Sequence, residues 1–235
     1  MTQSDYIFPL DFKIDPVEKL NFTNGPLVQL VEQFKINKAD ITHVGNQTDN
    51  HFKHTINNIN ELLSSINLVV YKATMFMSSG NIIGKNIHCD GMVDQSGTIA
   101  MLEARINLYE MSFGASSIEW WDSLPNSIPI DNNDDAWWKI PKLIQNPNGS
   151  HPFVICLPPF RHDLRSGKLN WNQIPVPNFG IKITSPSAFV RTNIPHHIMQ
   201  EGGIRVTLSL SIAFQTGKLE GVWEHIQNNI HLLKL

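Results

Sequence analysis

Two short segments, far apart in the sequence, carry side chains that bind transition metals. The first, at 86–91, reads Asn-Ile-His-Cys-Asp-Gly and places His88 and Asp90 two residues apart, just before a turn. On a β-strand, residues i and i+2 point to the same side, so both side chains can converge on one ion. A later segment, Ile-Pro-His-His-Ile, supplies His196 and His197. Two imidazoles and one carboxylate on one face, with open positions opposite, are the ligand set of non-haem ferrous sites.

These residues also have a simpler interpretation. A His-x-Asp pair is a weak signal by itself, because His88 and Asp90 can equally form a polar turn that caps a strand. Cys89 lies between them and is expected to face away from an ion, in the core.

Two strands with alternating side chains are predicted to position the ligands. Within Thr98–Glu110 and Gly203–Phe214, every second residue is apolar, so each strand buries one face in a core. The opposite faces carry polar side chains, which include Arg105, Asn107, Tyr109, Arg205, Thr207, Ser209 and Ser211. These faces meet either solvent, as in many antiparallel sheets, or the cleft of a small open barrel. The small hydroxyl side chains favour the cleft.

For three side chains on these faces, the sequence leaves two possible roles open. Arg105 is either a second contact for an anion or an ion-pair partner of Glu103. Asn107 and Tyr109 either line a cosubstrate or substrate pocket or form a structural hydrogen-bond pair.

The elements around these strands follow from hydrophobic periodicity. Leu27–Phe34, 51–67 and 219–233 show the spacing of amphipathic helices, whereas 36–50 is polar and reads as a loop. A strand is predicted at 68–77. We therefore expect one domain, with a helical support region at 1–80, a β core at 81–215 and a C-terminal helix at 216–235.

A long irregular insertion, at about 123–180, interrupts the predicted β core. It is rich in proline and holds Trp137 and Trp138, while Trp120 and Trp121 lie just before it. Such an excursion is usually functional or packs as a lid, so Trp120, Trp121 and Arg105 are candidates for a substrate pocket. The alternative is a proline-stiffened surface insertion with its aromatic side chains buried beneath it.

Composition narrows the classes of protein. The chain has 235 residues, 41% hydrophobic and 17% charged, with a formal net charge of -3. This apolar share supports a core and excludes general disorder, and the lack of a Lys/Arg-rich run argues against a nucleic-acid partner. Two cysteines do not make a disulfide framework, and no secretion signal or transmembrane segment is predicted. We expect a cytoplasmic protein with no membrane partner.

Taken together, these motifs resemble the Fe(II)- and 2-oxoglutarate-dependent dioxygenases of the prolyl-hydroxylase-like kind. The pattern of that family is His-x-Asp, a long interval, a His, and an Arg about ten residues later. Here it corresponds to His88-Cys89-Asp90, His196 and Arg205, and Thr207 matches the Ser or Thr that commonly follows the Arg. The resemblance covers roughly residues 80 to 215. The spacing to Arg205 favours His196 over His197 as the distal ligand, and His197 would point to the other side of a strand.

The resemblance implies a mainly β fold with flanking helices, a double-stranded β-helix (jelly roll, cupin-like). It also implies that His88, Asp90 and His196 hold Fe(II), with no catalytic residues beyond these ligands. Arg205 and Thr207 would bind the distal carboxylate of the cosubstrate 2-oxoglutarate. The implied activity is an oxidoreductase that hydroxylates a small molecule, amino acid or peptide side chain and releases succinate and CO2.

Two other functions stay open on the sequence. One is a jelly-roll binding or structural module without oxidation chemistry. The other is a cupin-type metalloenzyme that does not use 2-oxoglutarate, and which has no need of a carboxylate-binding Arg205.

Overall fold

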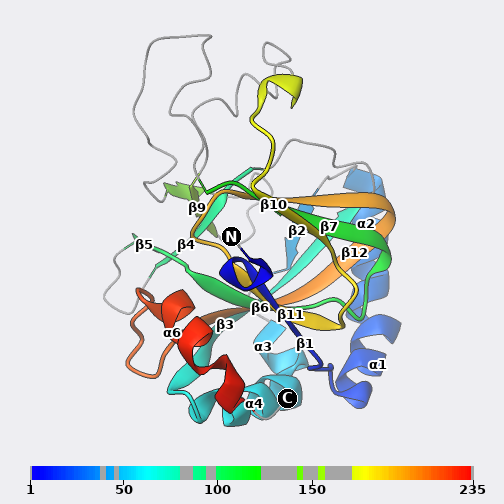
Figure 1. The fold of residues 1–235 in the computed structure, drawn as a ribbon. Helices are drawn as coiled ribbons and strands as arrows, with labels where there is room; N and C mark the ends of the chain where they lie inside the picture. The colour runs from blue at the N-terminus through cyan, green and yellow to red at the C-terminus, as the bar shows by residue number, and fades with distance from the viewer. Residues whose placement is uncertain are drawn as a thin grey trace.

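The computed structural model describes residues 2–37, 41–44, 48–79, 87–93, 99–122, 142–144, 153–156 and 171–233. Over these residues the protein is mainly β, and all described strand pairs are antiparallel. The helices gather mostly at one side of the strands (Figure 1). The prediction of a mainly β chain with flanking helices is confirmed.

The larger layer is a sheet whose central strands carry much of the predicted site. Its order is β1 (Ile7–Leu10), β11 (Ser187–Arg191), β6 (Ala104–Leu108), β12 (His196–Phe214), β3 (Leu68–Ser79) and β2 (Ile41–Val44). The second half of β12 lies between β3 and β6 and pairs with both.

The second layer forms around the first half of β12, which pairs with β7 (Phe113–Trp120), and β7 in turn pairs with β10 (Phe179–Lys182). On its other side, β12 meets β4 (Cys89–Val93) through one isolated bridge between His88 and His196. A small sheet extends from β4, in the order β5 (Ile99–Met101), β4, β9 (Phe153–Cys156) and β8 (Lys142–Ile144). In Figure 1, β7 and β10 lie on the side of the molecule opposite α4.

A bend in β12 lets one strand serve both layers. The register with β7 shifts between Glu201 and Ile204, and the two residues between them are Gly202 and Gly203. Both glycines have positive φ, +71° and +69°. Side chains with a Cβ rarely adopt this conformation, so the Gly-Gly pair allows the strand to bend without strain.

Helices cover the outer face of the larger sheet. They are α1 (Pro16–Asn24), α2 (Pro26–Asn37), α3 (Thr48–His51), α4 (Lys53–Ser64) and α6 (Val222–Asn229), with short 3-10 turns at Gln3–Asp5, Trp171–Gln173 and Ile230–Leu232. Asp15 caps α1 by accepting from the N–H groups of Val17 and Glu18. Glu18 in turn accepts from the N–H groups of His54 and Thr55 at the start of α4.

Two apolar clusters follow from the strand parity. One packs the helices against the sheet and includes Phe52, Leu63, Leu208, Leu210 and Trp223. The other lies between the two layers and includes Tyr6, Tyr109, Ile118, Trp120 and Val190. The strands β1, β6, β11 and β12 therefore present one face to the helices and the other to the space between the layers.

The predicted helices after Pro26, within 51–67 and at the C-terminus are confirmed as α2, α4 and α6. The loop predicted at 36–50 is wrong in part, because it contains β2, which pairs with β3, and α3. Besides its helices, the predicted helical support region at 1–80 contains β1, β2 and the whole of β3.

The single strand predicted at Thr98–Glu110 is instead two strands, β5 and β6. The break falls where backbone groups of Leu102 and Glu103 find other partners. The Leu102 N–H donates to the carbonyl of Asp90, and the Glu103 carbonyl accepts from the N–H of Thr192. The ladder therefore passes to different neighbours on each side of the break.

Most of the insertion at 123–180, including Trp137 and Trp138, lies outside the described residues. None of the helices in the described part of the chain has the length and apolar content that a bilayer crossing requires.

Candidate metal centre

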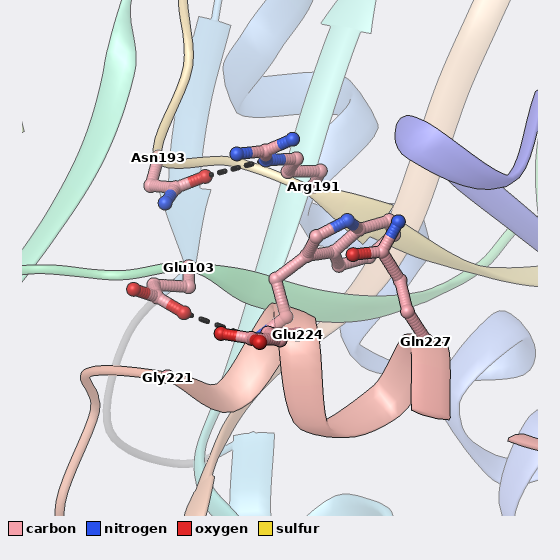
Figure 2. Close-up of a pocket in the computed structure, with 7 residues that line it drawn as sticks. Glu103, Arg191, Asn193, Gly221, Glu224 and Gln227 are labelled. Atoms are coloured by element: carbon pink, nitrogen blue, oxygen red, sulfur yellow. Dashed lines mark hydrogen bonds between the residues drawn. The ribbon is translucent and has the colours of Figure 1, made fainter. Parts of the chain in front are cut away.

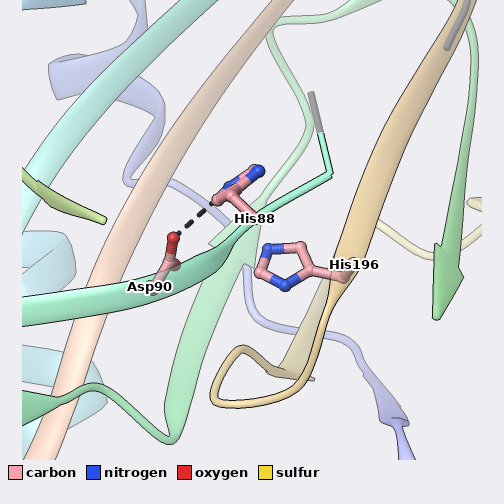
Figure 3. Close-up of side chains that lie close together, drawn as sticks. All are labelled: His88, Asp90 and His196. Atoms are coloured by element: carbon pink, nitrogen blue, oxygen red, sulfur yellow. Dashed lines mark ion pairs between the residues drawn. The ribbon is translucent and has the colours of Figure 1, made fainter. Parts of the chain in front are cut away.

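Three of the predicted ligands, His88, Asp90 and His196, lie together between β4 and the start of β12 (Figure 3). One ligand atom from each lies within 4.8 Å of the others, and His88 Nε2 is 3.4 Å from Asp90 Oδ1. With metal–ligand bonds of about 2.1 Å, two ligands at right angles are about 3 Å apart. His88 and Asp90 are close to this separation, and a small approach of the ligand atoms within the group would let all three bind one ion.

The backbone explains why residues so far apart in sequence meet here. The His88 N–H donates to the His196 carbonyl at 3.0 Å, and the His196 N–H donates to the His88 carbonyl at 2.9 Å. The Asp90 N–H donates to the carbonyl of Thr192 at 2.8 Å. Backbone hydrogen bonds thus hold His88 and Asp90 against the segment from Thr192 to His196.

The charge states suit a cation. Burial alone would raise the pKa of Asp90, but the Arg105 cation, a hydrogen bond from His88 and the nearby His196 outweigh it and hold that pKa far below its usual range. Burial, and then the neighbouring His88, lower the pKa of His196 to about 3. At neutral pH the centre therefore offers a carboxylate and a neutral His196 imidazole, the forms that bind metals.

A backbone contact fixes the tautomer of His196. Its Nδ1 lies 3.0 Å from the carbonyl oxygen of Ile194. A carbonyl can only accept, so Nδ1 carries the proton and Nε2 keeps a lone pair. Orientation of one ring nitrogen by such a bond is the usual arrangement of metal-binding histidines.

His197 faces the opposite side of the strand. It is fully buried, lies opposite Glu119 in the pairing with β7, and its Nδ1 is 3.8 Å from Glu119 Oε2. Of the two competing histidines, the structure brings His196, and not His197, beside His88 and Asp90.

Arg105 forms an ion pair with Asp90, a partner that was not considered from the sequence. Its Nε donates to Asp90 Oδ2 at 2.5 Å. The alternative of an ion pair with Glu103 is not seen among the described residues, where the Glu103 carboxylate accepts from the N–H of Trp223. Sequence reasoning missed the contact with Asp90, since it depends on where β4 lies relative to β6.

The polar face of β12 is buried, as the cleft interpretation predicted. Arg205 is 6% exposed, and Thr207, Ser209 and Ser211 are 1% exposed or less. These side chains share the parity that faces the space between the layers, while Leu208 and Leu210 pack with the helices. The interpretation of this face as a solvent surface is excluded.

Arg205 and Thr207 have unmet hydrogen-bonding capacity in this buried position. Within the described part of the chain, Arg205 Nε and Thr207 Oγ1 have no hydrogen-bond partner, and no described carboxylate pairs with Arg205. The guanidinium carbon lies 5.9 Å from the centre of the Tyr109 ring. A buried cation without a counter-charge is strongly unfavourable, so this arrangement fits a site that receives an anion.

Burial affects both groups of this pair. It lowers the pKa of Arg205, an effect that Tyr109 opposes. It also raises the pKa of Tyr109, an effect that the Arg205 cation opposes. Asn107 accepts a 2.6 Å hydrogen bond from the hydroxyl of Ser209 on the neighbouring strand β12, which fixes the Asn107 side chain.

The two tryptophans predicted near a substrate pocket are core residues. Trp120 and Trp121 are each 1% exposed or less. Their indole N–H groups donate to the carbonyls of Arg191 and Pro175, respectively. A substrate contact by either residue stays a prediction.

A separate hollow of about 400 Å³ lies beside α6 (Figure 2). It is lined by Glu103, Arg191, Asn193, Gly221, Trp223, Glu224 and Gln227. Arg191 Nε donates to Asn193, and Glu103 receives the Trp223 N–H at the start of α6. None of the predicted metal or cosubstrate residues lines this hollow, and these two hydrogen bonds hold the local structure.

No protein-family model and no curated protein matches the sequence. Among solved structures, HygX from Streptomyces hygroscopicus with iron bound matches with a TM-score of 0.46 and 8% identity, over 91% of this chain and 84% of that chain. HygX with nickel and 2-oxoglutarate bound matches with a TM-score of 0.43 and 7% identity, over 91% of this chain and 83% of that chain. AviO1 from Streptomyces viridochromogenes Tue57 matches with a TM-score of 0.43 and 9% identity, over 90% of this chain and 91% of that chain. These likenesses are too weak to transfer a function.

Proposed function

We propose that this chain is an Fe(II)- and 2-oxoglutarate-dependent oxygenase, a hydroxylase that releases succinate and CO2. The observation that carries the proposal is the pairing of two features on one strand. His196 joins His88 and Asp90 at the start of β12, and the buried Arg205, which pairs with none of the described carboxylates, follows on the same strand.

The strand order supports a double-stranded β-helix. One layer runs β11-β6-β12-β3, and the other runs β4-β12-β7-β10, with the link from β4 to β12 made by the His88–His196 bridge. A jelly roll of this kind has two antiparallel sheets facing each other. Under this proposal the whole chain is one domain, and β1, β2 and the helices support the larger sheet.

Each residue of the site has a chemical reason in this proposal. His88, Asp90 and His196 would hold Fe(II), because two imidazoles and one carboxylate on one face leave the opposite positions open. The Arg205 guanidinium is a planar fork suited to a carboxylate, and the Thr207 hydroxyl can donate a further hydrogen bond. When bound, iron and 2-oxoglutarate supply the oxidation of a C–H bond.

The buried setting of Arg205 serves binding in two ways. A low local dielectric strengthens its attraction for a carboxylate, and the Tyr109 ring, whose centre lies 5.9 Å from the guanidinium carbon, limits the room for water beside it. The hydrogen bond from Ser209 to Asn107 fixes two further side chains on the same buried polar face. Such preorganisation orients a cosubstrate without a cost of rearrangement at the time of binding.

The proposed substrate is a small molecule, an amino acid or a peptide side chain. The net charge of -3 and the absence of a basic run do not favour a nucleic-acid substrate. HygX has been crystallised with nickel, 2-oxoglutarate and hygromycin B. A small-molecule substrate is our choice for this chain too.

The decisive experiment is anaerobic titration of the apoprotein with Fe(II) and then 2-oxoglutarate, followed by optical absorption. We expect a weak visible charge-transfer band that needs both additions, and succinate formation once oxygen is admitted. A folded protein that binds Fe(II) but gives no band with 2-oxoglutarate would point to the cupin-type enzyme. A folded protein that binds neither would leave the non-catalytic jelly-roll module.

A further inference from the structure

Arg105 holds the proposed iron ligand Asp90 from the side opposite the histidines. Its Nε donates to Asp90 Oδ2 at 2.5 Å, while Asp90 Oδ1 lies 3.4 Å from His88 Nε2. The two carboxylate oxygens are therefore divided, one toward the cation of Arg105 and the other toward the imidazoles. Both side chains are largely buried, with exposed fractions of 11% and 9%.

The Arg105 side chain is itself fixed by β12. One terminal nitrogen donates to Ser211 Oγ at 3.0 Å and lies 3.5 Å from Ser209 Oγ. The guanidinium carbon sits 5.6 Å from the centre of the Phe76 ring on β3. Contacts from two neighbouring strands thus limit the rotation of the guanidinium group.

We propose that Arg105 is a positioning residue for Asp90, which it holds in the orientation that offers a single oxygen, Oδ1, to the metal. This inference rests on the proposed function. A carboxylate whose second oxygen accepts a charge-assisted bond is held as a one-oxygen ligand, which keeps further coordination positions of the ion open.

The geometry requires an arginine rather than any cation. Nε and the terminal nitrogen point in different directions, so one planar group reaches Asp90 and Ser211 at once. A lysine ammonium is a compact charge on a flexible stem and lacks this fork. Charge alone would compensate Asp90 but would leave its carboxylate free to rotate.

A purely structural role for Arg105 makes a different prediction. If Arg105 only neutralised a buried charge, its loss would lower stability and leave the coordination of a bound ion unchanged. The test must therefore read the geometry at the metal as well as folding. Co(II) provides this readout, because its d–d absorption depends on the number and arrangement of its ligands.

The experiment compares Co(II) binding and d–d spectra of the wild type with Arg105→Gln, Arg105→Lys and Ser211→Ala. Ligand-orienting partners typically contribute 10- to 100-fold to metal affinity, so we expect Arg105→Gln to bind about that much more weakly, with an altered spectrum. Arg105→Lys should fail to restore the wild-type spectrum. Ser211→Ala keeps the cation and should weaken binding measurably but less than Arg105→Gln does, with a smaller spectral change.

The matched control is Arg191→Gln. Arg191 is a half-buried arginine that bonds to Asn193 and to the Asp5 carbonyl, away from the centre, and its loss should leave Co(II) binding unchanged. Wild-type affinity and spectrum in folded Arg105→Gln and Ser211→Ala would overturn the inference and leave the proposed function standing. If Arg105→Gln does not fold, the Co(II) affinity and spectrum of Ser211→Ala decide instead: wild-type values in that variant would overturn the inference. Failure of the wild type to bind Co(II) or Fe(II) would instead overturn the proposed function.

Discussion

His88 and His196 form an isolated antiparallel bridge, with two hydrogen bonds of 3.0 and 2.9 Å, and their rings lie 4.4 Å apart. Among the described residues, this bridge is the one β-pairing between the segment that contains His88 and Asp90 and the strand β12. The same contact that joins the two segments therefore also sets the distance between two proposed iron ligands. Changes on the two faces of β12 should affect the metal very differently.

The first prediction compares the adjacent histidines. His196→Gln should lose metal binding by at least about 100-fold, because it removes a ligand, whereas His197→Gln should keep it within about threefold, because His197 faces Glu119. Calorimetric titration with Fe(II) or Co(II) measures both. Equal losses in the two folded variants would contradict the assignment of His196.

The second prediction concerns Arg205. Arg205→Met removes the charged partner proposed for 2-oxoglutarate, and a hydrogen bond to a charged group contributes about 1.5–3 kcal/mol. The 2-oxoglutarate affinity of the metal-loaded protein should fall by about 10- to 100-fold. The affinity for the metal itself should not change, which serves as the internal control. An unchanged affinity for 2-oxoglutarate would remove Arg205 from the cosubstrate site.

The third prediction tests the bend in β12. Gly202 has φ +71° and open space where a Cβ would lie, so Gly202→Ala should destabilise the fold through the backbone alone, by about 1–2 kcal/mol. Gly180→Ala is the matched control. Its φ is ordinary and its Cβ would meet Glu119 and Ile118 at 3.5 and 3.9 Å, normal contact distances, so stability should change little. Urea unfolding of both variants gives the comparison, and equal midpoints would exclude a conformational role for Gly202.

The fourth prediction is a dependence on alkaline pH that comes from Tyr6. Its hydroxyl donates to Asp122 at 2.6 Å, and burial, followed by the hydrogen bond and the charge of Asp122, raises its pKa well above 10. The unfolded chain loses this proton near pH 10 and the folded chain keeps it, so the stabilisation is complete below pH 10 and decreases as the pH rises further.

The variant Tyr6→Phe should therefore be less stable than the wild type at pH 8, by about 1.5–3 kcal/mol, and the difference should shrink above pH 10. Chemical unfolding between pH 8 and pH 11 measures this. A difference that stays constant over that range would show that the shifted titration does not belong to Tyr6.

The fifth prediction concerns metal removal. A ligand that binds only the folded state stabilises it by about 2.7 kcal/mol at a concentration 100 times its Kd. Fe(II) or Co(II) should therefore raise the Tm of the apoprotein, and a chelator should reverse the shift. The variant Asp90→Asn should show no such rise, and a rise equal to that of the wild type would exclude Asp90 as a ligand.

Strand parity was the most predictable part of the site. Alternation in Gly203–Phe214 separates Arg205 and Thr207 from Leu208 and Leu210, and the small hydroxyls indicate a buried interior rather than solvent. Both features are local, because the side-chain direction of a strand repeats every two residues. The orientation of His196 and His197 follows from the same rule.

What the sequence could not predict depends on partners that are distant in the chain. The alternation in Thr98–Glu110 continues without a break, yet Leu102 bonds to Asp90 and divides it into two strands. The strand β2 forms in a polar segment because β3 offers an unpaired edge. Likewise, the contact between Arg105 and Asp90 depends on how β4 lies against β6, which no local pattern specifies.

The passage of β12 through both layers has a consequence for how the proposed site can change in evolution. His196 and Arg205 belong to one continuous backbone segment, so the distance between them is set by the number of residues that separate them and by the Gly-Gly bend. Deleting one residue between them would turn Arg205 and Thr207 toward the helices and leucines toward the cleft. Related proteins that keep the site should therefore have no insertions or deletions within 197–204, even where they carry single substitutions there.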